Sequence, residues 1–404
     1  FVIDYIPPLF LFLYKIVVSF FEIVYSILTL FFGKGKAKMF IICPKCSVKY
    51  EIPEGIILEK GLTLQDFNII KVIGKGSTSK IYLAEYKRAE GELYAIKSIR
   101  KDQILSQGLI DNIIEERNIL GQDACPFLIS LANFFTTDQR IYFVMPYIPG
   151  GDLYHYLQQQ PGHRLDENSA RFYLAQIAIA LQHFHDYNTI YRDLKPENIL
   201  IDADGYIKVC DFGSSMHLKD KIDTTFTGTP AYMSPEMIEG NGHGTCSDWW
   251  SYGCIMYELL YGYPPFYDRD QDKMFNLIQL GEIKFPTDIK VSNHAIDLMK
   301  KLLERNPAKR LGTNGATEIE KHNFFGSYSV SFKALKEKKL TPPFKMEEMT
   351  YEEKKEAPNF DDDIAQVEKT TDENGNECLV ESPCEEWIID YKSWFYEFED
   401  EDGD

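Results

Sequence analysis

Apolar and polar positions along the chain predict two kinds of region after residue 60. The stretches "DFNIIKVIGKGSTSKIYLAEY", "ELYAIKSIR" and "RIYFVMPYI" are rich in β-branched and aromatic residues, with Gly, Ser and Pro punctuating them, and they predict strands. "GLIDNIIEERNILGQ" has helical apolar spacing and stops at Gly121, which predicts one helix among these strands. After Gly150 the pattern turns helical, as in "NSARFYLAQIAIALQHFHDY". We therefore predict an α+β chain with a small β-rich lobe followed by a larger helical lobe.

The beginning of the chain carries a separate hydrophobic segment, residues 1–38. From Leu9 to Phe32 the chain is almost continuously apolar, long enough to cross a bilayer as a helix, and lysines follow it. Lys15 and Glu22 interrupt this run. Because the first methionine is Met39, two interpretations stay open. The segment is either a single-pass membrane anchor or a gene-start artefact read from non-coding sequence.

Residues 39–66 are expected to form a linker. They include the pair Cys43 and Cys46, which is half of a zinc ribbon; zinc needs four ligands, so a plain surface turn is the competing interpretation. Most of the eight cysteines stand singly in apolar or mixed stretches, as in a reducing compartment. We therefore expect the folded part of the chain to be cytoplasmic.

The negative charge is concentrated in an acidic tail, residues 326–404. The whole chain has a net charge of −19, and residues 351–404 alone hold 20 acidic residues against 4 lysines. Because phosphates would be repelled by this tail, nucleic acid is not an expected partner.

The loop "IYRDLKPENILI" places polar residues between two apolar anchors. Asp193 can orient an attacking hydroxyl and accept its proton, Lys195 can neutralise a transferring phosphoryl group, and Asn198 offers an amide oxygen to a hard cation. Downstream, Asp211 in "VCDFG" follows a strand, where a carboxylate can bridge a magnesium ion to phosphates. The sequence therefore predicts phosphoryl transfer, with Asn198 and Asp211 as metal ligands.

The predicted small lobe contributes a glycine-rich turn and a lysine. Gly74 and Gly76 let backbone N–H groups approach phosphate oxygens, although an ordinary hairpin turn has the same appearance and Ser79 replaces a third glycine. Lys97 in "YAIK" and Glu116 on the following helix come from separate elements. Pairing them would hold the lysine against the phosphates.

Taken together, these motifs resemble those of eukaryotic Ser/Thr protein kinases over residues 67–325. The resemblance rests on the glycine loop, Lys97, Glu116, "YRDLKPEN", "DFG", "SPE", "DWWSYG" and Arg310 in "NPAKRLG". Tyr191 in place of the usual His, "YGYPPF" and the long tail are similar to the AGC group, which includes the cyclic-nucleotide-dependent kinases, protein kinase C and the S6 kinases. The resemblance implies a bilobal protein-kinase-like fold with an AGC-type tail. It also implies an enzyme that uses ATP with Mg²⁺, or alternatively Mn²⁺.

The resemblance also assigns nucleotide-binding and structural positions. Glu236 would form a buried pair with Arg310, and Leu120, Leu131, Tyr191 and Phe212 would stack as an apolar spine on the helix capped by Asp248. The implied nucleotide contacts are Ile73, Gly74, Lys75, Gly76, Ser77, Ser79, Ile81, Ala95, Lys97, Glu116, Met145, Tyr147, Ile148, Asp152, Glu197, Leu200 and the tail residue Phe360.

Substrate and regulatory positions follow from the same resemblance. Three acidic positions would bind basic residues upstream of the target hydroxyl: Asp152, Glu197 and Glu258. An apolar pocket for the residue after that hydroxyl would be lined by Phe226, Pro230 and Met233. Thr225 matches an activation-loop phosphosite whose phosphate would pair with Arg192, and it implies an upstream activating kinase as a partner beside protein substrates. Two further basic partners of that phosphate in relatives are here Asn112 and Met216.

The tail would regulate the enzyme by docking a hydrophobic motif, Phe395 and Phe398, beside the Glu116 helix, with Glu399 where some relatives carry a phosphorylated residue. Two other classes compete with an active kinase. A catalytically dead kinase fold acting as a scaffold requires the loss of Lys97, Asp193, Asn198 or Asp211, and all are present. A membrane-tethered adaptor rests on the first segment alone.

Overall fold

The computed structural model describes residues 39–42, 49–52, 62–76, 79–106, 110–120, 125–137, 139–218, 224–326, 330–345, 350–356, 369–371 and 377–379. The chain divides into two compact units, Phe1–Glu54 and Gly55–Asp404. The first contains strands β1 (Met39–Ile42) and β2 (Lys49–Ile52), which pair antiparallel with Met39 opposite Ile52. A strand pair therefore lies within the segment expected to be a linker.

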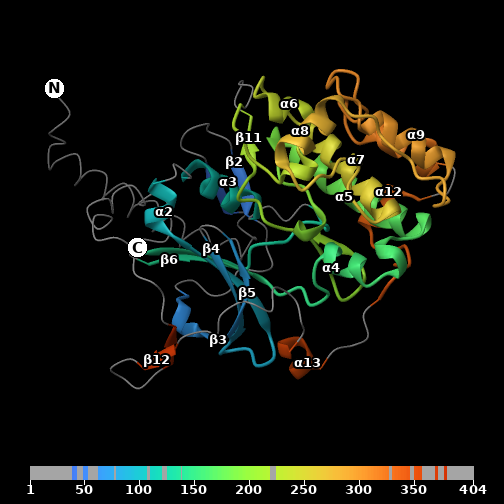
Figure 1. Cartoon of the computed structure of the whole chain (residues 1–404). Coiled ribbons are helices and arrows are strands. Elements are labelled where there is room, and N and C mark those ends of the chain that lie inside the picture. The colour runs from blue at the N-terminus through green and yellow to red at the C-terminus, as the bar shows by residue number, and fades with distance from the viewer. Residues whose placement is uncertain are drawn as a thin grey trace, which may run out of the picture. The chain divides into compact units, whose positions relative to one another are not determined.

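The second unit begins with a sheet of five antiparallel strands in the order β3-β4-β5-β7-β6 (Figure 1). The strands are β3 (Phe67–Lys75), β4 (Ser79–Tyr86), β5 (Leu93–Arg100), β6 (Asn133–Thr136) and β7 (Arg140–Pro146), preceded by the 3₁₀ turn η1 (Leu64–Asp66). Helices α2 (Lys101–Ser106) and α3 (Ile110–Leu120) follow β5. The sequence prediction of strands with one helix among them is confirmed, with α2 as an additional short turn of helix.

The lobe that follows β7 is mainly helical. Its helices are α4 (Leu153–Gln158), α5 (Glu167–Asp186), α6 (Pro235–Glu239), α7 (Cys246–Tyr261), α8 (Gln271–Leu280), α9 (Asn293–Leu302), α10 (Thr317–Glu320) and α11 (Asn323–Gly326). Helices α5 and α7 are buried along most of their length, and α7 contacts both α5 and α9. Because these helices carry apolar residues on nearly all faces, they form the centre of the larger core.

Short strands and turns between α5 and α6 carry the polar loops. They are β8 (Thr189–Ile190), β9 (Ile199–Ile201), β10 (Ile207–Val209) and β11 (Met216–His217), with the 3₁₀ turns η3 (Pro196–Asn198) and η4 (Pro230–Tyr232). A further 3₁₀ turn, η2 (Pro161–His163), lies earlier, between α4 and α5. Strand β9 pairs with β10 and β8 pairs with β11, both antiparallel. Each polar loop is thus fixed at both ends by a strand pair whose side chains are largely buried.

The segment after α11, predicted as an acidic tail, contains α12 (Phe332–Lys336), α13 (Tyr351–Glu356) and the strand pair β12 (Lys369–Thr371) with β13 (Glu377–Leu379). Its first part packs on the turn between β9 and β10: the Tyr206 hydroxyl donates to the Leu340 carbonyl, and Lys338 Nζ lies 2.6 Å from Asp204 Oδ2. Gly205 has φ +83°, and a Cβ there would collide with the Phe344 carbonyl. Glycine at that turn therefore permits the tail to dock.

Candidate active site

Lys97 joins the sheet to two carboxylates from other elements. Its Nζ, on β5, lies 2.5 Å from Glu116 Oε1 on α3 and 3.0 Å from Asp211 Oδ1, which follows β10. Burial disfavours the ammonium, but the charges of Asp211 and Glu116 outweigh it and raise the pKa of Lys97. The Lys97 charge in turn lowers the pKa of Asp211, more than burial raises it. The pairing of Lys97 with Glu116 predicted from the sequence is present.

The loop between β8 and β9 forms a compact set of hydrogen bonds around Asp193. Lys195 Nζ donates to Asp193 Oδ2 at 2.8 Å, and Asn198 Nδ2 donates to the Asp193 carbonyl at 2.9 Å and to Oδ2 at 3.2 Å. Because Nδ2 is the donor in both bonds, the Asn198 amide oxygen is the group left to bind a cation. The three side chains singled out in this loop are thus brought together.

Thr229 belongs to the same set, although the sequence did not single it out as a functional residue. Its hydroxyl donates to Asp193 Oδ1 at 2.6 Å and accepts from Lys195 Nζ at 2.9 Å. Its place directly before Pro230, at the start of η4, is the only signal in the sequence. The Thr229 hydroxyl therefore fixes Asp193 and Lys195 relative to each other.

Backbone strain marks both ends of this loop system. Arg192 has φ +70° and Asp211 has φ +57°, a left-handed conformation that non-glycine residues adopt rarely. Asp248, in the first turn of α7, accepts the backbone N–H groups of Tyr191 and Arg192, both at 3.0 Å. His185 Nε2 lies 2.8 Å from the same carboxylate. Asp248 thus stabilises the strained backbone just before Asp193.

The residues of the predicted apolar spine lie in or against one core cluster. Leu120, Tyr191 and Phe212 are buried in one core cluster, and Leu131 packs against it with its N–H donating to the Leu120 carbonyl. The rings of Tyr191 and Phe212 lie 6.1 Å apart at 78°. Since Phe212 follows Asp211, the packing of its ring against Tyr191 helps to fix the position of Asp211.

Residues expected to hold a nucleotide gather along β3, β4, β5 and β7. Ile73, Ala95, Ile81 and Tyr147 belong to one small apolar cluster. Lys75 ends β3, and the turn closes with the Gly76 N–H donating to the Ser79 carbonyl at 2.9 Å. Met145 pairs with Ala95 across β5 and β7, and Ile148 follows as a buried residue. Leu200 lies opposite Asp152 in an isolated bridge.

The donor set suits a divalent cation that also binds phosphate oxygens. Asp211 offers a carboxylate whose side chain is half-exposed, and Asn198 offers an amide oxygen. Magnesium is usually held by one or two protein carboxylates plus substrate phosphates rather than by a complete protein cage. No cluster of three or more metal-binding side chains occurs in the described ranges.

Comparison with known proteins identifies the family. The sequence profile "Protein kinase domain" matches residues 67–325. The chain belongs to the protein kinase family. It is 42% identical over 289 residues to the serine/threonine protein kinase ypkA of Aspergillus fumigatus, covering 71% of this chain and 45% of that one.

Further relatives are of the AGC Ser/Thr type. YPK1 of Saccharomyces cerevisiae is 40% identical over 325 residues, which is 80% of this kinase and 46% of YPK1. The RAC-beta serine/threonine-protein kinase A of Xenopus laevis is 39% identical over 297 residues, covering 72% and 60% of the two chains. This kinase spans about half the length of the first of these curated relatives. It is thus an AGC-type member with a β-sheet N-lobe and a helical C-lobe.

The acidic residues expected to bind basic substrates differ in exposure. Glu258 on α7 is buried and accepts the Tyr232 hydroxyl at 2.5 Å, and burial raises its pKa to about 7. Asp152 is also buried, whereas Glu197 is exposed. Tyr232 is therefore a further residue of this region that the sequence analysis did not single out.

The residues expected to line an apolar substrate pocket also differ. Phe226 is 57% exposed and its ring lies 6.0 Å from that of Phe275 on α8. Pro230 begins η4 and is half-buried, while Met233 is almost completely buried. Phe226 thus presents an accessible aromatic surface, whereas Met233 is buried in the interior.

The activation segment of the kinase is anchored near Arg192. Arg192 Nε donates to the Ser214 carbonyl, and Arg192 Nη1 lies 3.4 Å from Met216 Sδ. Asn112 Nδ2, on α3, donates to the Gly213 carbonyl at 3.2 Å. Asn112 and Met216, where the resemblance implied basic residues, thus contact Gly213 and Arg192 respectively, while Thr225 is exposed.

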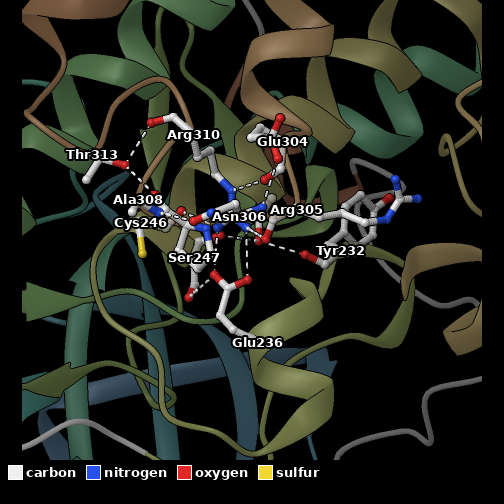
Figure 2. A network of polar contacts seen from close by, with 12 residues as sticks. Tyr232, Glu236, Cys246, Ser247, Glu304, Arg305, Asn306, Ala308, Arg310 and Thr313 are labelled. Atoms are coloured by element: carbon white, nitrogen blue, oxygen red, sulfur yellow. Dashed lines mark hydrogen bonds and ion pairs between the residues drawn. The ribbon is translucent and has the colours of Figure 1, made fainter. Parts of the chain in front are cut away.

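A bidentate ion pair supports the kinase C-lobe (Figure 2). Arg310 Nη1 lies 2.6 Å from Glu236 Oε1, and Nη2 lies 2.9 Å from Oε2. Ser247 Oγ adds a 3.0 Å bond to Oε1, and Arg310 also donates to the Cys246 carbonyl at 2.9 Å. The predicted pair between Glu236 and Arg310 is present and buried.

Several predicted features lie outside the described residues. They are the segment 1–38, Cys43, Cys46, Ser77, Phe360, Phe395, Phe398 and Glu399. In the part of the kinase that the structure describes, no helix is both long and apolar enough to cross a membrane. The roles expected for these residues stay predictions.

Proposed function

We propose that this protein is an active Ser/Thr protein kinase that transfers the γ-phosphoryl group of ATP to serine or threonine in proteins. One observation carries the proposal: Lys97, Glu116 and Asp211 form a linked triad, and Asp193, Lys195, Asn198 and Thr229 form a second linked set. An inactive scaffold has no need to keep both sets intact. The family uses ATP and a divalent metal, and we propose Mg²⁺, with Mn²⁺ as the alternative.

The chemistry assigned to each residue follows from its contacts. Lys97, held by Glu116, binds the phosphates; Asn198 and Asp211 bind the metal, which neutralises charge on the phosphates when it is present. Asp193 orients the substrate hydroxyl and accepts its proton, while Lys195 neutralises the oxygen atoms of the transferring group. Thr229 keeps Asp193 and Lys195 in register.

Basic residues upstream of the target hydroxyl are the proposed specificity signal. Asp152, Glu197 and Glu258 supply negative charge in this region, and a carboxylate binds an arginine guanidinium through two charge-assisted hydrogen bonds. Phe226, Pro230 and Met233 are proposed to favour an apolar residue after the hydroxyl. A peptide array that prefers acidic sequences would contradict this assignment.

Regulation is proposed to use two segments. An upstream kinase phosphorylates Thr225, whose phosphate then pairs with Arg192. The hydrophobic motif Phe395 and Phe398 docks beside α3, and Glu399 supplies a permanent negative charge in place of a phosphate. A chain truncated at Tyr391 should lose most activity; an unchanged rate would remove the motif from the account.

Location is proposed from the cysteines. Cys125, Cys210, Cys246 and Cys254 are unpaired thiols, as expected of a protein in a reducing compartment. We therefore place the kinase domain in the cytoplasm, with membrane association only if residues 1–38 belong to the mature chain. Sequencing the N-terminus of the purified protein decides between a start at Met39 and an earlier one.

The test of the proposed activity is phosphate transfer to a serine peptide rich in arginine. Wild-type protein with ATP and Mg²⁺ should phosphorylate it, and Asp193→Ala should not. A wild-type protein that binds ATP but transfers no phosphate would favour the scaffold instead.

A further inference from the structure

The carboxylate of Asp152 is held by its neighbour His155. Asp152 Oδ1 accepts the His155 backbone N–H at 2.8 Å, and Oδ2 lies 2.7 Å from His155 Nδ1. The Asp152 side chain is only 7% exposed, whereas that of His155 is 56% exposed. Both carboxylate oxygens of Asp152 therefore contact nitrogen atoms of His155.

The chemistry of this contact fixes the role of the ring. An ionised carboxylate only accepts hydrogen bonds, so the Nδ1 that approaches it carries a hydrogen and donates. A guanidinium from a substrate arginine would make the same kind of bond to the same oxygens. The His155 ring and a substrate arginine therefore compete for Asp152.

The surroundings of this pair are acidic. Burial first, and then the charges of Glu197, Glu258 and Asp152, raise the pKa of the neighbouring Tyr154. The three carboxylates therefore act on one hydroxyl, which places them in one region of the C-lobe. Of the two that are buried, Glu258 is bonded to a tyrosine hydroxyl and Asp152 to an imidazole.

We propose that His155 is a positioning residue that weakens the preference of this kinase for basic substrates by occupying Asp152. The inference rests on the proposed function, because it concerns which residues surround the target hydroxyl. It predicts opposite signs for two substitutions: loss of the His155 ring strengthens the preference for arginine, and loss of the Asp152 charge weakens it. His155 contacts neither reacting atoms nor the triad of Lys97, so its effect is on substrate affinity.

The experiment measures kcat/KM of the full chain on matched serine peptides at saturating ATP. The peptides form pairs, one pair for each position upstream of the serine. One member of a pair carries arginine at that position, and the other carries alanine there. His155→Ala should raise the arginine-to-alanine ratio about two- to fivefold at one position, the range expected for a partly exposed charged contact. The gain should appear as a lower KM for the arginine peptide.

His163→Ala is the matched control, since His163 is also exposed and its ring Nδ1 lies 2.9 Å from a backbone carbonyl oxygen, that of Gln158, rather than from a carboxylate. It should leave the ratio unchanged. Asp152→Asn removes the charge but keeps an oxygen that can cap α4. In this background His155→Ala should no longer change the ratio.

Three results would overturn the inference. The ratio could stay unchanged in His155→Ala, it could rise equally in the Asp152→Asn background, or the substitution could alter the KM for ATP equally with both peptides. Thermal unfolding of each variant shows whether the helix remains intact. Failure of the wild type to phosphorylate any peptide would instead contradict the proposed function itself.

Discussion

Lys97 Nζ lies 2.5 Å from Glu116 Oε1 and 3.0 Å from Asp211 Oδ1, so one ammonium group connects β5, α3 and the segment after β10. Lys97 and Glu116 are buried, and breaking such a pair leaves an uncompensated charge. The position of α3 is therefore coupled to the position of the residue proposed to bind the metal.

Replacing Glu116 should uncouple these elements. Glu116→Gln removes the charge that holds Lys97 against α3, and we expect kcat/KM to fall at least about tenfold, because small misplacements of a positioning group cost up to about 10²-fold in rate. The measurement is steady-state phosphorylation of an arginine-rich peptide. Glu115→Gln, at the adjacent position and near the Thr189 hydroxyl, is the control. Equal loss in both variants would mean that the pair has no special role.

The buried Glu258 predicts a dependence on pH. Burial raises the pKa of this carboxyl from 4.5 to about 7, so the group is protonated in the folded protein over a range in which it would ionise when unfolded. The folded state then binds more protons, and its stability falls as pH rises from about 4.5 to 7. Glu258→Gln should abolish this slope, worth up to about 3 kcal/mol.

The same ionisation should affect substrate choice. Above pH 7 Glu258 carries a charge that can bind arginine, so the arginine-to-alanine ratio of kcat/KM should rise between pH 6 and 8 in the wild type. In Glu258→Gln the ratio should be lower and flatter. A ratio that falls with pH in the wild type would contradict the assignment of Glu258.

The pair between Arg310 and Glu236 predicts a stability effect (Figure 2). Arg310→Ala leaves the Glu236 carboxylate buried without its bidentate partner, and the free energy of unfolding should drop by about 3–5 kcal/mol. Urea unfolding monitored by tryptophan fluorescence measures it. Lys301→Ala, which breaks an exposed pair with Asp297, should lower the free energy by less than about 1 kcal/mol.

Phosphorylation of Thr225 should have a limited effect. Arg192 already contacts Ser214 and Met216, and Asn112 contacts Gly213, so the segment is anchored while Thr225 carries no phosphate. We expect kcat of the phosphorylated enzyme to exceed that of Thr225→Ala. This gain should be smaller than the gain that phosphorylation gives in a Met216→Lys background. If phosphorylated enzyme and Thr225→Ala have equal rates, Thr225 is not a switch.

The triad and the catalytic loop could be predicted from the sequence because each residue sits in a motif with fixed neighbours. Lys97 lies within a strand pattern, Glu116 lies on a helix with clear apolar spacing, and Asp193 stands between apolar anchors. The resemblance of these motifs, in this order, to those of protein kinases brought them together in the prediction.

Other contacts could not be predicted, because they depend on how loops are placed. Thr229 reaches Asp193 across 36 residues, and nothing in "GTP" indicates its partner. His155 is close to Asp152 in sequence, but only the geometry of the turn entering α4 aligns its ring with the carboxylate. Helices α12 and α13 are too short for a periodic pattern to stand out from the charged residues around them.

Phosphate transfer by wild type and Asp193→Ala tests the account most directly. Each protein is incubated with ATP, Mg²⁺ and an arginine-rich serine peptide, and the product is located by mass spectrometry, with nucleotide binding measured in parallel. The account predicts phosphoserine from the wild type, a rate lower by roughly 10²–10⁴-fold in the variant, and similar ATP binding by both. Bound ATP without phosphoserine in the wild type, or an undiminished rate in Asp193→Ala, would contradict it.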